Sequence, residues 1–145
     1  MNALSAERPE IIRKAFPGTW YYPKWQLVVW FPRGVLNDAF ADQVVTFVEM
    51  EERLQDAAFN RYTDLSGLTE IRLKLPHFFH TATRRRRVSL PAKSAFLAPD
   101  AVSFSIACMY EMLMDKAKID VCAFRDRKTA AAWLDVPMRI LQPPK

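Results

Sequence analysis

Residues 93–134 decide the fold, and they contain KSAFLAPD (93–100), KIDVCAFRD (118–126) and TAAAWL (129–134). The first two segments are short apolar runs that end in an acidic residue, and each is followed by apolar residues at helical spacing. This pattern predicts strand, helix, strand and helix, with Asp100 and Asp126 capping the two helices. Nearly continuous apolar runs are typical of central parallel strands, so the sequence favours an α/β domain.

The residues before this stretch continue the alternation of extended and helical patterns. A tight turn at Pro23-Lys24 is expected to join two aromatic strands. The predicted elements are strands at 20–22, 25–31, 60–65, 92–98 and 119–124, an extended segment at 69–74, and helices at 37–54, 76–87, 100–113 and 126–134.

The apolar residues of the helices predict which faces are buried. The 76–87 helix should be buried through Phe79 and Ala82, and the long helix before it through a stripe that ends at Leu54. Val102 begins the corresponding stripe of the 100–113 helix. In the N-terminal arm, Ser5 is expected to cap a short helix with this apolar stripe: Ile11, Ile12, Ala15 and Phe16.

The length of 145 residues fits one domain with an adequate core. We expect an N-terminal arm (1–19), the domain (20–136) and a loose proline-rich tail (137–145). The three glycines, Gly18, Gly34 and Gly67, are too far apart to form the phosphate-binding motifs GxGxxG or GxxxxGK[ST]. Cys108 and Cys122 lie in apolar stretches and are expected to be buried free thiols in a reducing compartment. Neither a membrane-span pattern nor a signal peptide is recognisable, so a cytoplasmic location is expected.

Polar residues gather where the carboxyl ends of the predicted strands should meet, which is where open α/β sheets bind ligands. The set is Asp64, Ser66, Pro99, Asp100, Ser103, Arg125 and Asp126. One hypothesis is a polar binding site for a ligand or partner. The favoured alternative is structural, with Asp100 and Asp126 as helix N-caps and Arg125 paired with a carboxylate. Because no histidine or cysteine joins the set, no catalytic base is evident, and neither an enzyme nor a cofactor is expected.

Two basic features have weak functional interpretations. His77 and His80 are three residues apart on a predicted helix, but nothing at suitable spacing supplies further ligands, so no metal is expected. The run Arg84–Arg87 carries much of the net charge of +5. Four consecutive residues point around a helix in different directions. A solvated helix end with one arginine packed along its stem is therefore favoured over binding of nucleic acid or lipid phosphates.

Aromatic residues are denser near the N-terminus than a small sheet requires. Core packing is the first explanation, and the surplus is expected either to line an apolar cavity or to form a homodimer surface. The candidates for that cavity or surface are Trp20, Tyr22, Trp25, Trp30, Met109 and Met112.

The order of the predicted elements resembles that of the STAS domain. The sequence motifs most resemble those of the SpoIIAA-like branch, which is similar to CRAL-TRIO lipid-binding domains. The likeness spans about residues 25–135 and is carried by NRYTDLS (60–66), AFLAP (95–99), ACMYE (107–111), FRD (124–126) and AAWL (131–134). It implies a single domain with a mixed sheet of about five strands and about four helices. STAS antagonists are switched by phosphorylation of a serine at a helix start, which makes Ser66 the candidate. Here Ser66 departs from that pattern, because it falls about ten residues before the predicted helix.

The leading hypothesis is a non-catalytic cytoplasmic module that acts through a protein partner or a small ligand. The alternative is a carrier or sensor of an apolar or lipid-like molecule, held in a cavity between helices and sheet. Nucleic-acid binding is a third and weaker possibility.

Overall fold

The computed structural model describes residues 8–11 and 16–143, which form an α/β domain around one mixed sheet. The sheet has the order β1-β2-β3-β5-β7-β8, in which β3, β5, β7 and β8 are parallel and β1 and β2 are antiparallel. Its strands are β1 (Glu10–Ile11), β2 (Thr19–Tyr22), β3 (Leu27–Trp30), β5 (Asn60–Asp64), β7 (Ala92–Leu97) and β8 (Ile119–Phe124). The helices are α2 (Asp38–Gln55), α3 (Leu75–Arg86), α4 (Ala101–Leu113) and α5 (Arg127–Leu134). The predicted fold class is confirmed.

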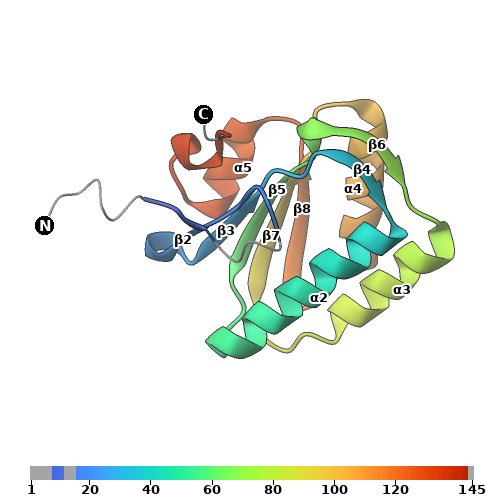
Figure 1. Ribbon diagram of the computed structural model, residues 1–145, viewed down its shortest axis with the longest axis horizontal. Helices are drawn as coiled ribbons and strands as arrows, with labels where there is room; N and C mark the ends of the chain where they lie inside the picture. The colour runs from blue at the N-terminus through green and yellow to red at the C-terminus, as the bar shows by residue number, and fades with distance from the viewer. Residues whose placement is uncertain (1–7, 12–15, 144–145) are drawn as a thin grey trace, which may run out of the picture.

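Helices cover both faces of the sheet, and the alternation of the strands determines what each face meets. Leu27 and Val29 belong to a core cluster shared with α5, whereas Val28, between them, packs in a cluster with Phe47 of α2. Further along the same face, Val121 packs in a cluster with residues of α3 and α4. Figure 1 shows α2 and α3 side by side, with α5 near the C-terminus on the other side of the sheet.

A second, two-stranded parallel sheet joins β4 (Gly34–Asn37) to β6 (Leu68–Arg72). The extended segment predicted at 69–74 is therefore confirmed in large part, but β4 was not predicted. A Cβ at Gly67 would lie 2.9 Å from the carbonyl oxygen of Pro32. Only glycine permits this approach, which brings the starts of the two strands together.

Side-chain caps begin three of the helices, and two of them, at Asp100 and Asp126, are those that the sequence predicts. Asn37 Oδ1 accepts a hydrogen bond from the Phe40 backbone N–H at 2.8 Å at the start of α2. Asp100 and Asp126 cap α4 and α5 in the same way. Helix α3 has no side-chain cap and carries a proline in its first turn. The backbone N–H of Lys74, the residue just before α3, donates to Asp38 Oδ1 of α2 at 3.1 Å.

Several predictions of burial are wrong. In α3 it is Phe78, at 8% exposure, that is buried, while Phe79 is 45% exposed. The buried face runs through Phe78, Ala82 and Arg85, which are four and three residues apart, and Phe79 lies off it. Leu54 and Val102 are also exposed, because each lies in an end turn of its helix, beyond the contact with the sheet.

The ends of the chain also differ from expectation. Glu10–Ile11 is a strand paired with β2 rather than part of a helix, while Ser5, Ile12 and Ala15 lie outside the described residues. The turn after β2 is a 3-10 helix (Pro23–Trp25) that includes Trp25. The tail predicted to be loose contains a second such turn, η3 (Met138–Leu141), whose Ile140 and Leu141 are buried in the core. No helix in the described part of the chain is long and apolar enough to cross a membrane.

Candidate functional site

The strand-end edge holds a buried carboxylate, Asp64, at the end of β5. Its Oδ1 accepts from the backbone N–H of Ser66 at 3.0 Å and from the Ser66 hydroxyl at 2.5 Å. Its Oδ2 accepts from the Tyr62 hydroxyl at 3.2 Å and from Arg127 at 2.9 Å. Burial and the adjacent carboxylate raise the pKa of Tyr62, which keeps that phenol a neutral donor. Asp64 is thus fully engaged as a structural acceptor.

The other acidic residues of this edge are helix caps, as the structural alternative predicts. Asp100 accepts from the backbone N–H and the hydroxyl of Ser103, at 2.9 and 2.7 Å. Asp126 accepts from the backbone N–H and the hydroxyl of Thr129, both at 2.8 Å. These hydrogen bonds lower the pKa of both carboxyl groups. Both residues therefore serve the N-termini of α4 and α5.

Arg125 does not pair with a carboxylate as that alternative supposed. It donates to the carbonyl oxygen of Pro99 at 2.9 Å, and its guanidinium lies 5.0 Å from the centre of the Phe104 ring. Six of the seven predicted edge residues therefore form three local pairs, and the seventh, Asp126, bonds to Thr129. No side-chain hydrogen bond or ion pair joins one of these pairs to another among the residues described. Arg127, absent from the predicted set, makes the cross-link from α5 to Asp64.

Ser66 is exposed and lies in a 3-10 turn (Leu65–Gly67), nine residues before the start of α3. This confirms that it is not at the positive end of a helix. Its hydroxyl donates to Asp64, so a phosphate there would face a carboxylate, with the half-buried Arg127 on the far side of that carboxylate. Phosphorylation of Ser66 stays a prediction.

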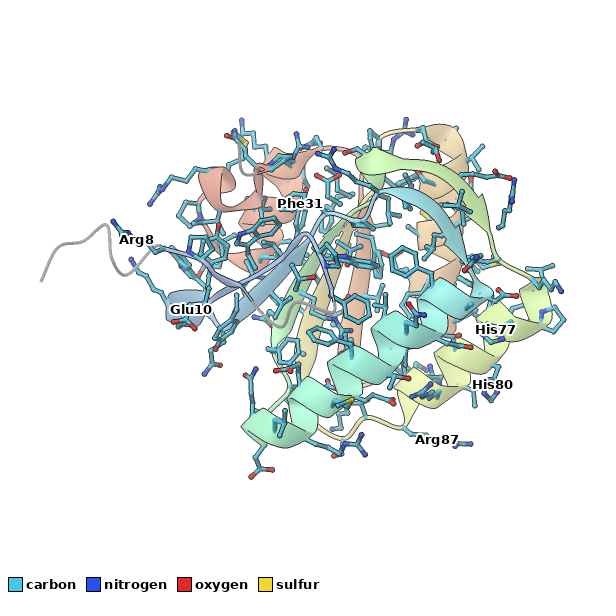
Figure 2. The ribbon with its side chains drawn as sticks, viewed as in Figure 1. Arg8, Glu10, Phe31, His77, His80 and Arg87 are labelled. Carbon is cyan, nitrogen blue, oxygen red and sulfur yellow. The ribbon has the colours of Figure 1, made fainter. Side chains whose placement is uncertain are left out.

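The two histidines form no metal site among the described residues. Figure 2 shows both on α3, where the His77 ring lies 6.3 Å from that of His80 and its Nε2 is 2.7 Å from Asp42 Oδ1 on α2. His77 therefore joins α3 to α2.

The arginine run ties α3 to its neighbours rather than forming one basic patch. Arg84 and Arg85 pair with α2 carboxylates, and Arg86 donates to the carbonyl oxygens of Leu113 and Asp115. Arg85 is 2% exposed, which agrees with the predicted single buried arginine. Figure 2 shows Arg87 at the end of α3, pointing away from the protein.

A cavity of about 170 Å³ lies between the sheet and helices α2, α3 and α4, and it is partly open to solvent. Its walls are mainly apolar: Val28 and Trp30 of β3, Val44 and Phe47 of α2, Phe78 of α3 and Ile106 of α4 contribute. Leu36 and Ile71, from the β4–β6 sheet, close one side. The cavity lies between helices and sheet, on the face opposite α5.

Several polar side chains of the cavity wall make no hydrogen bond to a described residue, and Arg61, Ser94 and Tyr110 are among them. Ser94 is 1% exposed and its Oγ has no partner. Arg61 of β5 and Ser94 of β7 are direct partners in the parallel register, so their side chains are adjacent on the cavity face. Burial, and next the cation of Arg85, lower the pKa of Arg61 to about 10.

Of the residues predicted to line a cavity or dimer surface, Trp30 alone belongs to this cavity wall as described. Tyr22 is buried against α5, and Trp20 and Trp25 pack half-buried against the same cluster. Met109 is half-buried. Met112 is 74% exposed and borders an open hollow of about 530 Å³ beside β8.

Sequence reasoning missed Arg61 and Ser94, because the face on which Arg61 lies follows from the strand register of the folded protein. In a strand, Arg61 must face opposite to Tyr62 and Asp64. Since Val28 pairs with Arg61 in the sheet, both lie on the face that the long amphipathic helix covers. A cation in that position indicates a polar element inside the core.

Comparison with known proteins supports the fold. No family model matches the chain, and no curated protein matches it. The structure is similar to that of an uncharacterized protein of the DUF3478 family from Shewanella loihica, described as having a SpoIIAA-like fold. The TM-score is 0.52 at 13% identity, over 88% of this chain and 92% of that chain. At this identity the likeness concerns the fold, which is SpoIIAA-like here as the sequence resemblance implied.

Proposed function

We propose that this SpoIIAA-like domain is a non-catalytic binding module that holds a small, largely apolar ligand between its sheet and α2, α3 and α4. The observation that carries the proposal is the cavity of about 170 Å³. Protein interiors contain few voids larger than a water molecule. A closed and empty cavity of this size would cost about 4 kcal/mol of stability, at about 24 cal/mol per Å³. Because this cavity is partly open to solvent, that figure is an upper limit on the cost that a bound ligand offsets.

The size of the cavity limits the ligand. An apolar cavity of about 150 Å³ accommodates benzene, so an aromatic ring or a short alkyl chain is the largest group that fits inside. The partial opening gives such a molecule a route from solvent.

The other groups of the domain support binding rather than catalysis. Each carboxylate at the strand-end edge is engaged by hydrogen bonds to its neighbours. Burial, and next a hydrogen bond with Glu111, raise the pKa of the half-buried Cys122 thiol to about 11. A thiol with that pKa is a poor nucleophile at neutral pH.

A protein partner, the other half of the leading hypothesis, has less support. The aromatic residues proposed for a dimer surface pack mostly on the protein's own core. At the β8 edge, Glu111 Oε1 of α4 accepts from the backbone N–H of Ala123 at 3.0 Å, which occupies a donor that a pairing strand would need.

Titration with benzyl alcohol, followed by methyl NMR, tests the cavity. Saturable shifts are expected at Val28, Val44 and Ile71, whose side chains line it. Val44→Phe should fill the space and abolish these shifts. Met50→Phe, on an exposed position of the same helix, is the matched control and should leave them unchanged. Shifts that fail to saturate, or that survive Val44→Phe, would overturn the proposal. Mass spectrometry of protein from its own host, under native and then denaturing conditions, would show a carried ligand as a mass excess present only in the native spectrum.

A further inference from the structure

The cavity has a positively charged pole. Arg61 lies in the third of four parallel strands counted from the β8 edge, at a row of the sheet that also contains Val28, Ser94 and Val121. The neighbours on either side of Arg61 and Ser94 in this row are apolar. A guanidinium in such a row needs an anion or a set of hydrogen-bond acceptors to replace water.

The nearby carboxylates are already paired with other arginines. Arg84 Nη2 lies 2.5 Å from Glu49 Oε1, and Arg85 Nη1 lies 3.0 Å from Glu52 Oε1 and 3.4 Å from Glu49 Oε2. These two arginines and two glutamates balance one another in charge. Arg61 makes no hydrogen bond or ion pair with any residue that the structure describes, and the attraction of the more distant Glu52 carboxylate only partly offsets its burial and the repulsion from Arg85.

Two hydroxyl groups adjoin this cation. Ser94, its register partner on β7, has a buried Oγ without a partner. The hydroxyl of Tyr110, on α4, lies near enough to Arg61 for each to influence the other's pKa. Burial raises the pKa of Tyr110, so the phenol is a neutral hydrogen-bond donor at physiological pH. The pole therefore offers donors from three elements, β5, β7 and α4.

We propose that the ligand of this cavity is an apolar monocarboxylate whose head group binds Arg61, Ser94 and Tyr110 while its aromatic ring or short alkyl chain fills the apolar part. This inference rests on the proposed function and adds the chemical class of the ligand. A guanidinium pairs with a carboxylate through two parallel N–H···O bonds, and each carboxylate oxygen retains a lone pair for a hydroxyl donor. Arg61 then gains the anion that its surroundings lack, and Ser94 gains a partner for its hydroxyl.

A matched pair of probes tests the charge preference. Benzoate and benzyl alcohol are similar in size and differ at the head group, and their affinities are measured by isothermal titration calorimetry or by NMR titration. The unmodified protein should bind benzoate at least about tenfold more tightly, since an additional charge-assisted hydrogen bond is worth about 1.4 kcal/mol or more. Equal affinities, or a preference for the alcohol, would refute the carboxylate assignment while leaving the apolar cavity intact. Binding of neither probe would refute the proposed function itself.

Variants locate the preference within the cavity. Arg61→Met should reduce the ratio of benzoate to benzyl alcohol affinity to about one, with the alcohol affinity changed less than about threefold. Arg61→Lys should retain part of the ratio, and Ser94→Ala should lower benzoate affinity a fewfold. Arg87→Met removes an exposed arginine as the control, and it should have no effect. A ratio that survives Arg61→Met, or that falls with Arg87→Met, would contradict the proposal. If Arg61→Met does not fold, the ratios of the unmodified protein and of Arg61→Lys decide the question.

Discussion

Replacing Arg61 with methionine should stabilise the ligand-free protein. Methionine keeps an unbranched side chain of similar reach for the apolar row and removes the charge. Removing an arginine from a protein core usually leaves a carboxylate unpaired, but no carboxylate pairs with Arg61 among the described residues. The substitution therefore removes the free-energy cost of a partly desolvated cation and leaves no carboxylate without a partner.

The size of the effect follows from the pKa of Arg61. Burial, followed by the cation of Arg85, lowers this pKa from 12.5 to about 10. At about 1.4 kcal/mol per unit, the depression corresponds to about 3 kcal/mol against the charged form. Solvent reaches part of the side chain and screens the effect, so we expect a gain of about 1–2 kcal/mol in the free energy of unfolding. A depressed pKa on a cationic group means that the unfolded chain binds the proton more tightly. The full penalty is thus present at neutral pH and diminishes only as the pH rises through about 10.

Urea unfolding at pH 7, without added ligand, measures this gain. Arg85→Met is the comparison variant, and it should lower the free energy of unfolding. Arg85 is 2% exposed and is paired with two carboxylates, one of them on the 12% exposed Glu52. Its removal leaves Glu52 without its arginine, while Glu49 keeps Arg84, and should cost about 3 kcal/mol. If Arg61→Met destabilises the protein to a similar extent, Arg61 has a compensating partner, and the case for an anionic ligand fails with it.

Three further predictions concern the fold and its caps. Phe78→Ala should lower the free energy of unfolding by about 3–5 kcal/mol, whereas Phe79→Ala should change it by no more than about 0.5 kcal/mol, because only Phe78 is buried; equal losses in urea unfolding would contradict the assignment of the α3 face. Val44→Phe should raise the thermal unfolding midpoint by filling the cavity, and a lowered midpoint would mean that the cavity is already packed or cannot accept a ring. Asp126→Ala should lower the midpoint at pH 7, and the difference should narrow as the pH falls below 3.8, because hydrogen bonds from Thr129 hold the pKa of this carboxyl below that value in the folded state only; a pH-independent difference would point to a cause other than the ionised cap.

The fold was predictable because its signals are local. Asp100 and Asp126 cap helices after apolar strands, and both the caps and the strands depend on residues close in the sequence. The β4–β6 sheet was not predictable in this way, since a close approach between Gly67 and Pro32 brings distant segments together. Phe78 and Phe79 show the limit at finer scale, because two adjacent aromatic residues fit a helix equally well until its neighbours determine which face is buried.

The candidate site depends on contacts between distant segments, which the sequence does not show. The polar residues at the strand ends are easy to recognise in the sequence because they follow apolar segments directly, yet in the folded protein they form helix caps and local pairs. Arg61 is inconspicuous in the sequence, since NRYTD begins a strand with polar residues that a solvated edge would also accept. Only the strand order shows that β5 lies between β3 and β7, with helices over its Arg61 face.

A residue that contradicts its surroundings in this way is a stronger indication of function than one that satisfies them. Asp64 is more deeply buried, at 2% exposure, but it receives four hydrogen bonds, so the fold alone explains it. Arg61 and Ser94 are adjacent, face an apolar cavity, and lack partners among the described residues. Folding gains nothing from placing a cation there. Binding does, because a guanidinium that has already lost part of its water and has no hydrogen-bonded partner among the described residues is prepared for an anion. The same desolvation that lowers the stability of the empty protein therefore increases the affinity for a carboxylate, and the two effects should disappear together in Arg61→Met.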